Sequence, residues 1–470
     1  MTQRFDALIV GAGQAGPSLA ARLAKAGRKV ALIERHLLGG TCVNTGCTPT
    51  KALVASAHAA HLARRGPDFG IQTGPVTVNW GDVKARMDGI VTKSRSGLEK
   101  WLGSTPNCTM IRGQARFTGA HSMQIGEETY EAQQIFLNVG ARPLVPKMPG
   151  VDAVPFLTST SILELDALPQ HLVVVGGGYV GLEFAQIFRR FGCRVTLVEK
   201  GVRLASHEDD DAAKVIHEVF AGEGIDIRLN ANCIHLERRD RGVSVGLHCD
   251  RGDPHVDGSH VLLAVGRVPN TDDLNLGAAG IDADEYGFIH VDEALQTNVP
   301  GVYALGDCNG HGAFTHTSYN DYEIVADNLL SGGTRKVSDR IPASAVYIDP
   351  PLARVGMSEA EVRKSGKPAL MAVREMTRVS RAIEKGETAG FIKVLVDAET
   401  RQILGATVFG VGGDEAIHCI LTAMYARQPA SLLTHSVHIH PTVAELIPTT
   451  FGELKPLGSV APSRNAARNN

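Results

Sequence analysis

Two cysteines, Cys42 and Cys47, lie in the segment GGTCVNTGCTPTK (residues 39–51). On a straight α-helix their spacing corresponds to about 7.5 Å along the axis, whereas disulfide-linked Cα atoms usually lie about 4.4–6.8 Å apart. The thiols can therefore pair only across a distorted turn, which Gly46 and Pro49 favour. Two inert thiols or half of a zinc site are the alternatives, but no second cysteine pair completes a zinc tetrad. We expect a redox pair and no metal site.

A second group able to do chemistry lies near the C-terminus, in the segment HIHPTVAE (438–445). Histidine exchanges protons near neutral pH, and a carboxylate bonded to one ring nitrogen fixes its tautomer. His440 and Glu445 form the candidate pair. A purely structural histidine is the alternative.

Residues 6–34 predict a strand (DALIV), a glycine turn (GAGQAG), a helix and a second strand (KVALIE). In such a βαβ unit the glycines let the backbone approach a pyrophosphate at the helix N-terminus, and the acid accepts from a ribose hydroxyl. The residues concerned are Gly11, Gly13, Gly16 and Glu34. A tight strand-to-helix turn without a ligand is the alternative.

The same pattern returns in residues 171–199, as HLVVV, GGGYVG, a helix and RVTLVE. Its corresponding residues are Gly176, Gly178, Gly181 and Glu199. The duplication predicts two nucleotide sites. Glu199 favours NAD(H), because a carboxylate repels a 2′-phosphate. Lys200 and Arg203 follow at once, so NADP(H) is the alternative.

Later segments differ in character. The strand-like TNVPGVYALGD (297–307) ends in Asp307, which suits an acid that meets a polyhydroxyl chain; a generic turn is the alternative. From about Ala343, β-type segments surround a helix-like stretch at 415–427, which predicts a separate α+β domain. The Pro/Ser/Asn/Arg-rich end from about Pro456 is expected to be frayed.

Composition excludes several classes of protein. The 470 residues correspond to about three domains, and 43% hydrophobic with 21% charged residues excludes a largely disordered chain. Forty-seven Lys+Arg against 50 Asp+Glu give no case for nucleic acid or an anionic membrane as principal partner. Sparse cysteines, and no long apolar run or signal sequence, predict a cytoplasmic location.

The order of these motifs resembles the flavin-dependent pyridine nucleotide-disulfide oxidoreductases, the family of dihydrolipoamide dehydrogenase, glutathione reductase and mercuric reductase. The motifs that carry the resemblance are GAGQAG, GGTCVNTGCTPTK, GGGYVGLE, AVGRVPN, GVYALGD and HIHPTVAE. It implies an α/β fold with two Rossmann-like dinucleotide-binding domains, for FAD and NAD(P), and a C-terminal α+β dimerisation domain. The expected parts are residues 1–150 (FAD), 151–270 (NAD(P)), 271–342 (return to the FAD or central domain) and 343–470 (interface).

The resemblance also implies individual roles. Cys42 is similar to the family's interchange thiol, which attacks substrate, and Cys47 resembles the flavin-proximal charge-transfer thiol. Lys51 and Glu183 match an ion pair near flavin N5. His440, with Glu445, matches an acid/base that the second subunit provides, so a homodimer with shared active sites is expected.

Further residues are assigned to cofactors. Tyr179 matches an aromatic that gates the nicotinamide pocket, with a simple packing ring as the alternative. Asp307 matches the acid that binds the FAD ribityl chain. The full expected FAD set is Gly11, Gly13, Gly16, Glu34, Thr41, Lys51, Gly140 and Asp307. The full expected NAD(P) set is Gly176, Gly178, Tyr179, Gly181, Glu199 and Gly266.

The subgroup is harder to predict. CVNTGC resembles mercuric reductases, but a C-terminal cysteine pair is missing and the HPT histidine, which those enzymes lack, is present. Segments 314–322 and 376–381 look more like the copper-reducing, reactive-chlorine-resistance branch. Arg378, Arg381 and Lys385 are either an entrance for an anionic substrate or solvated surface charges.

We therefore expect an FAD-dependent NAD(P)H:disulfide oxidoreductase, similar to lipoamide dehydrogenase, that acts on a small-molecule or protein disulfide. A metal-ion reductase for Hg(II) or Cu(II) is the first alternative. The second is a non-catalytic flavoprotein redox sensor, against which the presence of His440 and Glu445 argues.

Overall fold

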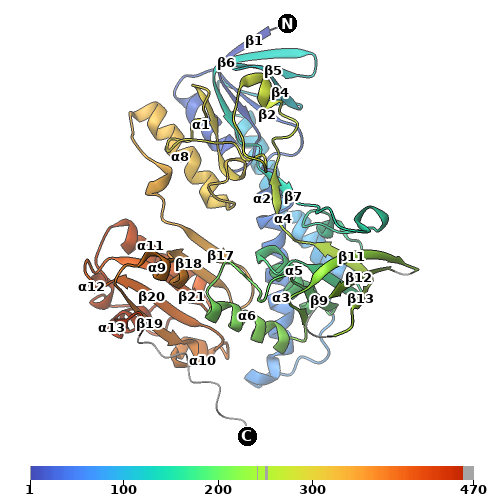
Figure 1. Ribbon diagram of the computed structural model, residues 1–470, viewed down its shortest axis with the longest axis vertical. Coiled ribbons are helices and arrows are strands. Elements are labelled where there is room, and N and C mark those ends of the chain that lie inside the picture. Colours follow the sequence, from blue (N-terminus) through green and yellow to red (C-terminus); the bar gives the residue numbers. More distant parts are fainter. Residues whose placement is uncertain (1, 241, 249–251, 459–470) are drawn as a thin grey trace. The chain divides into compact units, whose positions relative to one another are not determined.

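The computed structural model describes residues 2–240, 242–248 and 252–458 (Figure 1). The chain forms two compact units. Unit 1 comprises Met1–Ser56, Thr77–Pro169 and His260–Arg340. Unit 2 comprises Ala57–Val76, Gln170–Ser259 and Ile341–Asn470. The chain thus leaves unit 1 and returns to it twice.

Unit 1 is built on a parallel sheet extended by an antiparallel hairpin. Its strands are β3 (Cys108–Arg112), β2 (Val30–Glu34), β1 (Thr2–Val10), β6 (Glu128–Leu137), β5 (Ser122–Ile125) and β4 (Ala115–Gly119), in this spatial order. β16 (Val302–Ala304) also pairs in parallel with β6. A parallel sheet of this kind needs cover on both faces.

The side chains of β1 supply both covered faces. Leu8 and Val10 belong to one hydrophobic core, together with Phe117 of β4. Ala7 and Ile9 belong to the other, which includes the apolar side of α1 (Gly16–Lys25). Successive strand residues point to opposite faces, so one apolar run fills two cores.

The remaining elements of unit 1 carry the candidate site residues or connect them. They are α2 (Gly40–Asn44), α3 (Cys47–Arg64, up to residue 56), α4 (Trp80–Gly103), β7 (Ala141–Pro143), η2 (Val151–Ala153), η3 (Ser161–Glu164), β14 (His260–Leu263), β15 (Arg267–Pro269), α7 (Leu276–Ala279), η4 (Gly306–Asn309), α8 (Thr315–Ser331) and η5 (Val337–Asp339).

Unit 2 contains a second parallel arrangement and a small antiparallel sheet. β8 (His171–Val175) pairs with β9 (Arg194–Val198), and β9 pairs with β10 (Asp226–Arg228). α5 (Tyr179–Arg190) connects β8 to β9, and α6 (Asp210–Gly222) connects β9 to β10. β11 (Asn232–Arg239), β12 (Gly242–His248) and β13 (His255–Gly258) follow as an antiparallel sheet.

The C-terminal part of unit 2 is an antiparallel sheet with helices packed on it. Its strands are β17 (Ala343–Val346), β18 (Leu352–Gly356), β21 (Ile403–Phe409), β20 (Phe391–Asp397), β19 (Ala369–Glu375) and β22 (Lys455–Pro456), in this spatial order. Its helices are α9 (Glu359–Ser365), η6 (Met376–Arg378), α10 (Ser380–Glu384), α11 (Gly413–Tyr425), α12 (Ser431–Thr434) and α13 (Leu446–Gly452), and η1 (Gly66–Phe69) also belongs to unit 2.

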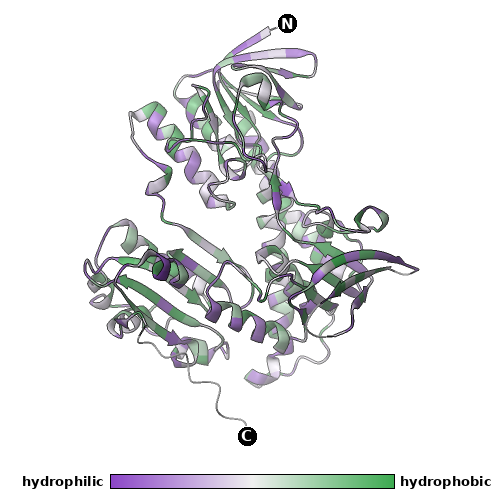
Figure 2. Cartoon of the chain, viewed as in Figure 1, coloured by the Kyte–Doolittle hydropathy of each residue, from purple (hydrophilic) through white to green (hydrophobic). Residues whose placement is uncertain are grey.

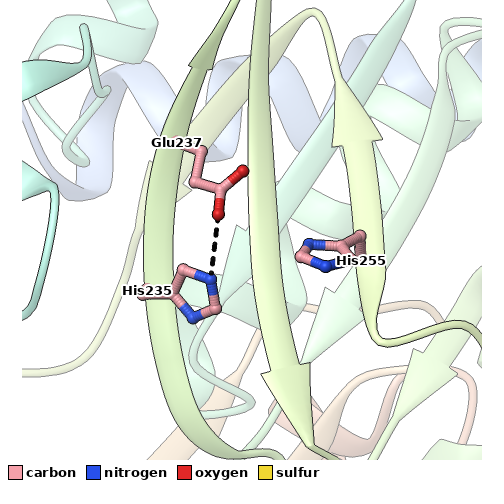
Figure 3. A group of neighbouring side chains, drawn as sticks. All are labelled: His235, Glu237 and His255. Atoms are coloured by element: carbon pink, nitrogen blue, oxygen red, sulfur yellow. Dashed lines mark ion pairs between the residues drawn. The ribbon is translucent and has the colours of Figure 1, made fainter.

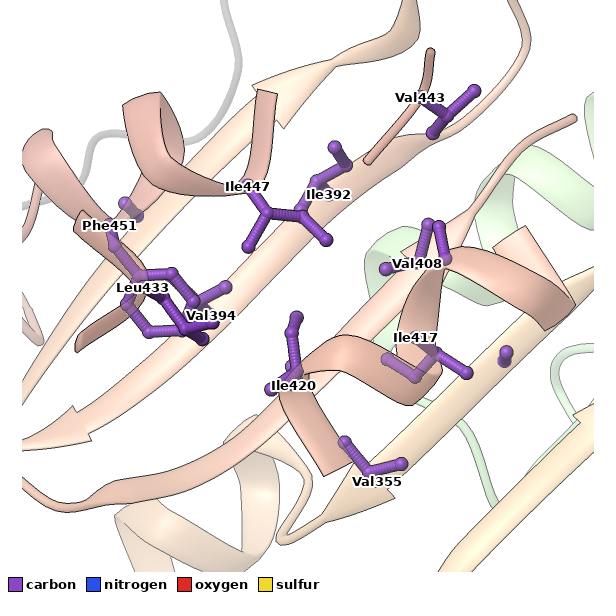
Figure 4. Packing of buried hydrophobic residues seen from close by; sticks show 14 of the residues in the cluster. Val355, Ile392, Val394, Val408, Ile417, Ile420, Leu433, Val443, Ile447 and Phe451 are labelled. Atoms are coloured by element: carbon purple, nitrogen blue, oxygen red, sulfur yellow. The ribbon is translucent and has the colours of Figure 1, made fainter. Parts of the chain in front are cut away.

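This C-terminal core packs sheet against helices (Figure 4). Val394 and Val408 of the sheet lie in one cluster with Ile417 and Ile420 of α11 and Phe451 of α13. In Figure 2 the helices carry both hydrophobic and hydrophilic colours, as expected of elements with one buried side. The predicted helix near 415–427 is thus confirmed as α11.

Buried charges in unit 2 are paired. The guanidinium of Arg190, only 6% exposed, contacts Glu223 at 2.7 Å and Asp349 at 2.5 Å. Asp349 also contacts Nδ1 of His58 at 2.6 Å. Burial by itself would raise the pKa of Asp349, but the His58 hydrogen bond and the Arg190 charge together lower it. The charged network therefore stabilises unit 2 at neutral pH.

The α/β fold with a C-terminal α+β part is as the sequence predicts, and the division into four parts stays a prediction. One detail differs. Pro456, where the sequence predicts that the frayed tail begins, pairs with Leu370 of β19 as the last residue of β22 (Lys455–Pro456). This edge strand is set by pairing with distant residues, which composition does not reveal. The rest of that tail, residues 459–470, lies outside the described residues.

None of the helices in the described part of the chain is long and apolar enough to cross a membrane.

Candidate active site

The first glycine turn leaves no room for side chains. Gly11 has φ +101°, and a Cβ added there would lie 2.2 Å from the carbonyl oxygen of Asn138. A Cβ on Gly16 would lie 2.2 Å from the carbonyl oxygen of Gly11. A Cβ on Gly13 would meet the Asn138 amide at 3.1 Å. The backbone between β1 and α1 is therefore as closely packed as a dinucleotide turn requires.

Glu34, at the end of β2, stabilises this turn by accepting hydrogen bonds from the backbone. Its Oε2 accepts a hydrogen bond of 2.8 Å from the backbone N–H of Ala12, and its Oε1 accepts one of 2.8 Å from that of His36. Each carboxylate oxygen has a further lone pair for a ribose hydroxyl. The turn, the helix N-terminus and the acid together fit a dinucleotide such as FAD.

The second glycine turn repeats this construction in unit 2. Gly176 has φ +115°, and a Cβ on Gly181 would lie 2.0 Å from the carbonyl oxygen of Gly176. Glu199 accepts hydrogen bonds from the backbone N–H of Gly177 at 2.6 Å and of Gly201 at 2.7 Å. Gly178 precedes α5 and is exposed, so the helix N-terminus is open to a ligand. This geometry fits the second dinucleotide, NAD(P).

The two cations that follow Glu199 differ in their surroundings. Arg203 pairs with Asp210 and donates to the carbonyl oxygen of Ser206 at 3.1 Å. Lys200 is exposed. Since Arg203 already has an acidic partner, it is less suited to hold a 2′-phosphate than the sequence alone suggests.

Tyr179 is the first residue of α5, beside the second glycine turn. Its hydroxyl donates a hydrogen bond to Glu208, and Glu208 pairs with Arg354 at 3.3 Å. Burial and the charge of Glu208 raise the pKa of Tyr179. The hydrogen bond to Glu208 therefore fixes the position of the Tyr179 ring. Its role as a gate to the nicotinamide pocket stays a prediction.

Asp307 lies in η4, immediately after Gly306, whose φ is +71°. Its Oδ2 lies 3.4 Å from a guanidinium nitrogen of Arg267. Burial raises the pKa of Asp307, and the positive charge of Arg267 opposes that rise. A partly buried acid held in this way can accept hydrogen bonds from ligand hydroxyls.

The loop around Asp307 is anchored by a residue that the sequence does not single out. Asp321 of α8, 1% exposed, accepts from the backbone N–H of Gly306 at 2.8 Å and from the amide of Asn309 at 3.1 Å. Arg340 completes the anchor through an ion pair with Asp321.

Cys42 and Cys47 lie on two separate helices. α2 ends at Asn44, and α3 begins at Cys47. A Cβ on Gly46 would lie 2.9 Å from the carbonyl oxygen of Thr41, so the break brings the chain close to the previous turn. The distorted turn expected between the two cysteines is therefore present.

Cys42 and Cys47 are not joined by a disulfide, and their side chains interact. The hydrogen bond to Cys47 is the largest cause that raises the pKa of Cys42, followed by burial, whereas Thr315 and the charge of Lys51 oppose the rise. Sγ of Cys47 lies 3.2 Å from the hydroxyl of Thr315, the first residue of α8. This arrangement favours the protonated form of Cys42 by raising the pKa of its thiol.

Lys51 and Glu183, the expected ion pair, belong to different units. Lys51 lies on α3, one helical turn after Cys47. Glu183 of α5 is 6% exposed and accepts a 2.9 Å hydrogen bond from the backbone N–H of Tyr347. Their pairing stays a prediction.

The remaining residues that the sequence predicts to bind a cofactor are Thr41, Gly140 and Gly266. Thr41 is exposed on α2. Gly140 (φ +67°) and Gly266 (φ +136°) precede β7 and β15, which pair antiparallel in unit 1. Their carbonyl oxygens accept from the N–H groups of Asn270 and Leu144, at 3.0 and 2.9 Å. The two glycines thus mark opposite ends of one two-stranded ribbon.

His440 and Glu445 lie together in unit 2, with 2.8 Å between Nδ1 and Oε2. Two apolar side chains close to His440 in the sequence are strongly exposed, Val437 at 100% and Ile439 at 80%. His435 is exposed and His438 is partly buried.

The basic residues proposed as an entrance are partly engaged. Arg378 lies 3.8 Å from Glu453, and Arg381 lies 3.1 Å from Glu384. Lys385 is exposed. Pairs of this kind are typical of a solvated surface.

Sequence reasoning missed Thr315, Asp321 and Glu208. Thr315 and Asp321 lie in a segment noted only for its family resemblance, and Glu208 lies in a loop between β9 and α6. No local pattern marks them, because each acts through a contact with a distant residue.

The turns, the paired cysteines and the acid beside a polar loop define a flavoprotein that carries two dinucleotides and a dithiol. The chain matches the family described as "Pyridine nucleotide-disulphide oxidoreductase" over residues 5–321, and the dimerisation domain of that family over residues 342–451. It therefore belongs to the pyridine nucleotide-disulphide oxidoreductase family, whose members bind FAD and NAD(P)H.

Individual relatives lie in three groups. The "Probable pyridine nucleotide-disulfide oxidoreductase RclA" of Escherichia coli (strain K12) is 37% identical over 463 residues, which cover 96% of this chain and 100% of RclA. Mercuric reductase of Streptomyces lividans is 33% identical, with 94% of each chain covered. Dihydrolipoyl dehydrogenase of Thermus scotoductus is 33% identical, with 94% of this chain and 95% of the relative covered.

A solved structure of RclA, described as an "HOCl-induced flavoprotein disulfide reductase", superposes with a TM-score of 0.87 at 35% identity, over 96% of this chain and 100% of that one. Another is described as the Cu(II) complex of RclA, with the same TM-score, identity and share of this chain. The protein studied here is thus an FAD-dependent disulfide oxidoreductase by family, and its C-terminal part is a dimerisation domain.

Proposed function

We propose that this protein uses NAD(P)H to reduce a disulfide substrate through the dithiol of Cys42 and Cys47. The observation that carries the proposal is the interaction of these two thiols across the break between α2 and α3. The glycine turn at Gly11 with Glu34 would hold FAD, which would supply the electron pair that NAD(P)H provides for reduction of the enzyme disulfide.

The dithiol then needs a base. Because its hydrogen bond to Cys47 raises the pKa of Cys42, Cys42 holds a proton that must leave before its sulfur can attack. His440 takes this proton, and Glu445 holds the imidazole in the required tautomer.

The Cys42 thiolate forms a mixed disulfide with one half of the substrate, and the departing thiolate receives the proton from His440. The Cys47 thiolate attacks the Cys42 sulfur, which restores the enzyme disulfide and releases the second thiolate, protonated by solvent. One hydride and one solvent proton are consumed for each disulfide reduced to two thiols.

We further propose that His440 serves the dithiol of the partner subunit in a homodimer. The exposure of Val437 and Ile439 supports this, because apolar side chains so close to a functional histidine are expected to be covered by another surface. The small number of cysteines, eight in 470 residues, favours a cytoplasmic location.

Turnover of NADH and NADPH with lipoamide, glutathione disulfide, cystine, Hg(II) and Cu(II) tests the proposal. We expect a disulfide in this panel to be reduced with steady-state turnover. Absence of turnover with every acceptor would favour a redox sensor instead.

A metal-ion reductase is the second candidate. The Cu(II) complex of RclA and the similarity to a mercuric reductase favour it. Electron transfer to a metal ion needs no proton shuttle, so loss of the His440 imidazole separates the two functions.

A further inference from the structure

The small antiparallel sheet of unit 2 brings three ligand-type side chains together. In its register His235 of β11 is opposite Gly246 of β12, and Gly246 is opposite His255 of β13. The two histidines therefore flank a glycine on one face of the sheet, with Glu237 two residues after His235 on the same face. Figure 3 shows the two imidazoles on either side of the middle strand.

Gly246 makes this approach possible. A Cβ added at this position would lie 2.1 Å from Cε1 and 2.2 Å from Nε2 of His235. The imidazole of His235 thus lies close beside the middle strand, in space that a side chain at position 246 would fill. The rings of His235 and His255 are perpendicular, with their centroids 6.0 Å apart.

The three side chains have the separations of a ligand set. Nε2 of His235 lies 3.3 Å from Oε1 of Glu237, and one ligand atom from each of the three residues lies within 4.8 Å of the others. Ligands about 2.0–2.1 Å from a tetrahedral ion are about 3.3 Å apart. The pair on β11 already has this spacing, and the ligand atom of His255 lies within 4.8 Å of both.

The other charges on this face suit a cation. Arg239 pairs with Oε2 of Glu237 at 3.2 Å, which orients the carboxylate and leaves Oε1 toward His235. Arg239 also lies 3.6 Å from Asp257 of β13. When both histidines are neutral, the carboxylates of Glu237 and Asp257 and the guanidinium of Arg239 together give this face a net negative charge.

We propose that His235, Glu237 and His255 bind a divalent transition-metal cation, with Cu(II) or Zn(II) as the favoured class. Two imidazoles and one carboxylate are ligands of intermediate hardness, which favour these ions over Mg²⁺ or Ca²⁺. The side chains of His235 and Glu237 are 34% and 41% exposed, so water completes the coordination. The sequence analysis predicts no metal site. The three ligands of the proposed site lie on two different strands, β11 and β13, and a linear sequence pattern does not reveal how these strands are arranged.

The test uses the full-length flavoprotein with Cys42→Ser and Cys47→Ser, so that the dithiol binds no metal. Zn(II) is titrated in competition with a chromophoric chelator, and Cu(II) is examined by electron paramagnetic resonance. We expect one ion per chain, and nitrogen couplings in the Cu(II) spectrum. His235→Ala combined with His255→Ala is expected to remove this ion, and Glu237→Gln to weaken affinity at least tenfold.

Two further variants sharpen the test. Gly246→Ala keeps all three ligands but displaces the His235 imidazole, and is expected to weaken affinity at least tenfold. His217→Ala removes an exposed histidine of α6 in the same unit and is expected to change nothing. Retained FAD absorbance and far-ultraviolet circular dichroism establish that each variant is folded. Unchanged binding in the His235/His255 variant, or equal losses with His217→Ala, would overturn the proposal.

Discussion

Nδ1 of His440 lies 2.8 Å from Oε2 of Glu445. The side chain of the histidine is 74% exposed, whereas that of the glutamate is 14% exposed. A carboxylate that accepts from Nδ1 leaves Nε2 as the acceptor on the exposed part of the ring. The pair is thus arranged to exchange a proton with a group outside its own segment.

His440→Gln is expected to lower disulfide turnover by roughly 10²–10⁴-fold, the usual contribution of a positioned acid/base. FAD content, dimer formation and reduction of the flavin by NADH are expected to persist, because none of them needs this proton transfer. Steady-state and stopped-flow kinetics measure the two processes separately.

The matched control is His435→Gln, which changes an exposed histidine five residues before His440. It is expected to behave as the wild type. Disulfide turnover at the wild-type rate in His440→Gln would refute the proposed mechanism, and retained Cu(II) or Hg(II) reduction beside lost disulfide turnover would favour the metal-ion reductase.

The two thiols are expected to have distinct spectral effects. Cys47→Ser is expected to abolish the long-wavelength absorption band of the two-electron-reduced holoenzyme, because the thiolate that donates to oxidised flavin is lost. Cys42→Ser is expected to show that band without reduction, since it leaves Cys47 unable to form a disulfide. An unchanged flavin spectrum in both variants would show that the thiol assignment is wrong.

Thr315→Val is expected to alter the dithiol, because the Thr315 hydroxyl lies 3.2 Å from Sγ of Cys47 and opposes the raised pKa of Cys42. Loss of one hydrogen bond, about 0.5–1.5 kcal/mol, corresponds to an upward shift of up to about one pH unit in the thiol titration. The pH dependence of the rate at which iodoacetamide alkylates Cys42 in the reduced enzyme measures this shift, because the long-wavelength band reports the thiolate of Cys47. Thr315→Ser keeps the hydroxyl and is expected to restore the wild-type midpoint; a downward shift in Thr315→Val would contradict this role.

NADH is expected to exceed NADPH at least tenfold in kcat/KM, which corresponds to about 1.4 kcal/mol. The reason is the carboxylate of Glu199, which is fastened to the glycine turn by two backbone N–H groups. Glu199→Gln is expected to narrow the preference, whereas Lys200→Ala leaves NADH kinetics unchanged. A clear preference for NADPH would instead assign Lys200 and Arg203 to the 2′-phosphate.

Asp349→Ala is expected to reduce the free energy of unfolding of unit 2 by about 1.5–3 kcal/mol, the usual value of a hydrogen bond to a charged group. Burial favours protonation of Asp349, but His58 and Arg190 lower its pKa in the folded protein below the unfolded value of about 3.9. The stabilisation is therefore complete above the unfolded pKa and is lost as the pH falls through the folded pKa.

Denaturant unfolding at neutral and acidic pH checks this expectation: the difference between wild type and Asp349→Ala should shrink as the pH falls. Asp166→Ala is the control, because its contact with Lys84 at 3.5 Å involves a fully exposed carboxylate. It is expected to change stability by less than about 0.5 kcal/mol. A difference that grows in acid would contradict the assigned direction.

The sequence by itself determined the features that depend on neighbouring residues. Gly11, Gly16, Gly176 and Gly181 are required by the backbone of their own βαβ turns, so their spacing already identifies them. The break between Cys42 and Cys47 is equally local, since Gly46 lies within it. These constraints are read from short stretches of chain.

Only the tertiary structure decided the contacts between distant segments. Thr315 contacts Cys47, which lies 268 residues earlier in the sequence. Asp321 of α8 accepts a hydrogen bond from the backbone N–H of Gly306, in the loop that carries Asp307. His235 and His255 meet over Gly246 because of one strand register, and a shift by one residue would turn each histidine to the opposite face. Strand register and packing depend on the free energy of the whole fold. A short stretch of sequence therefore does not predict them.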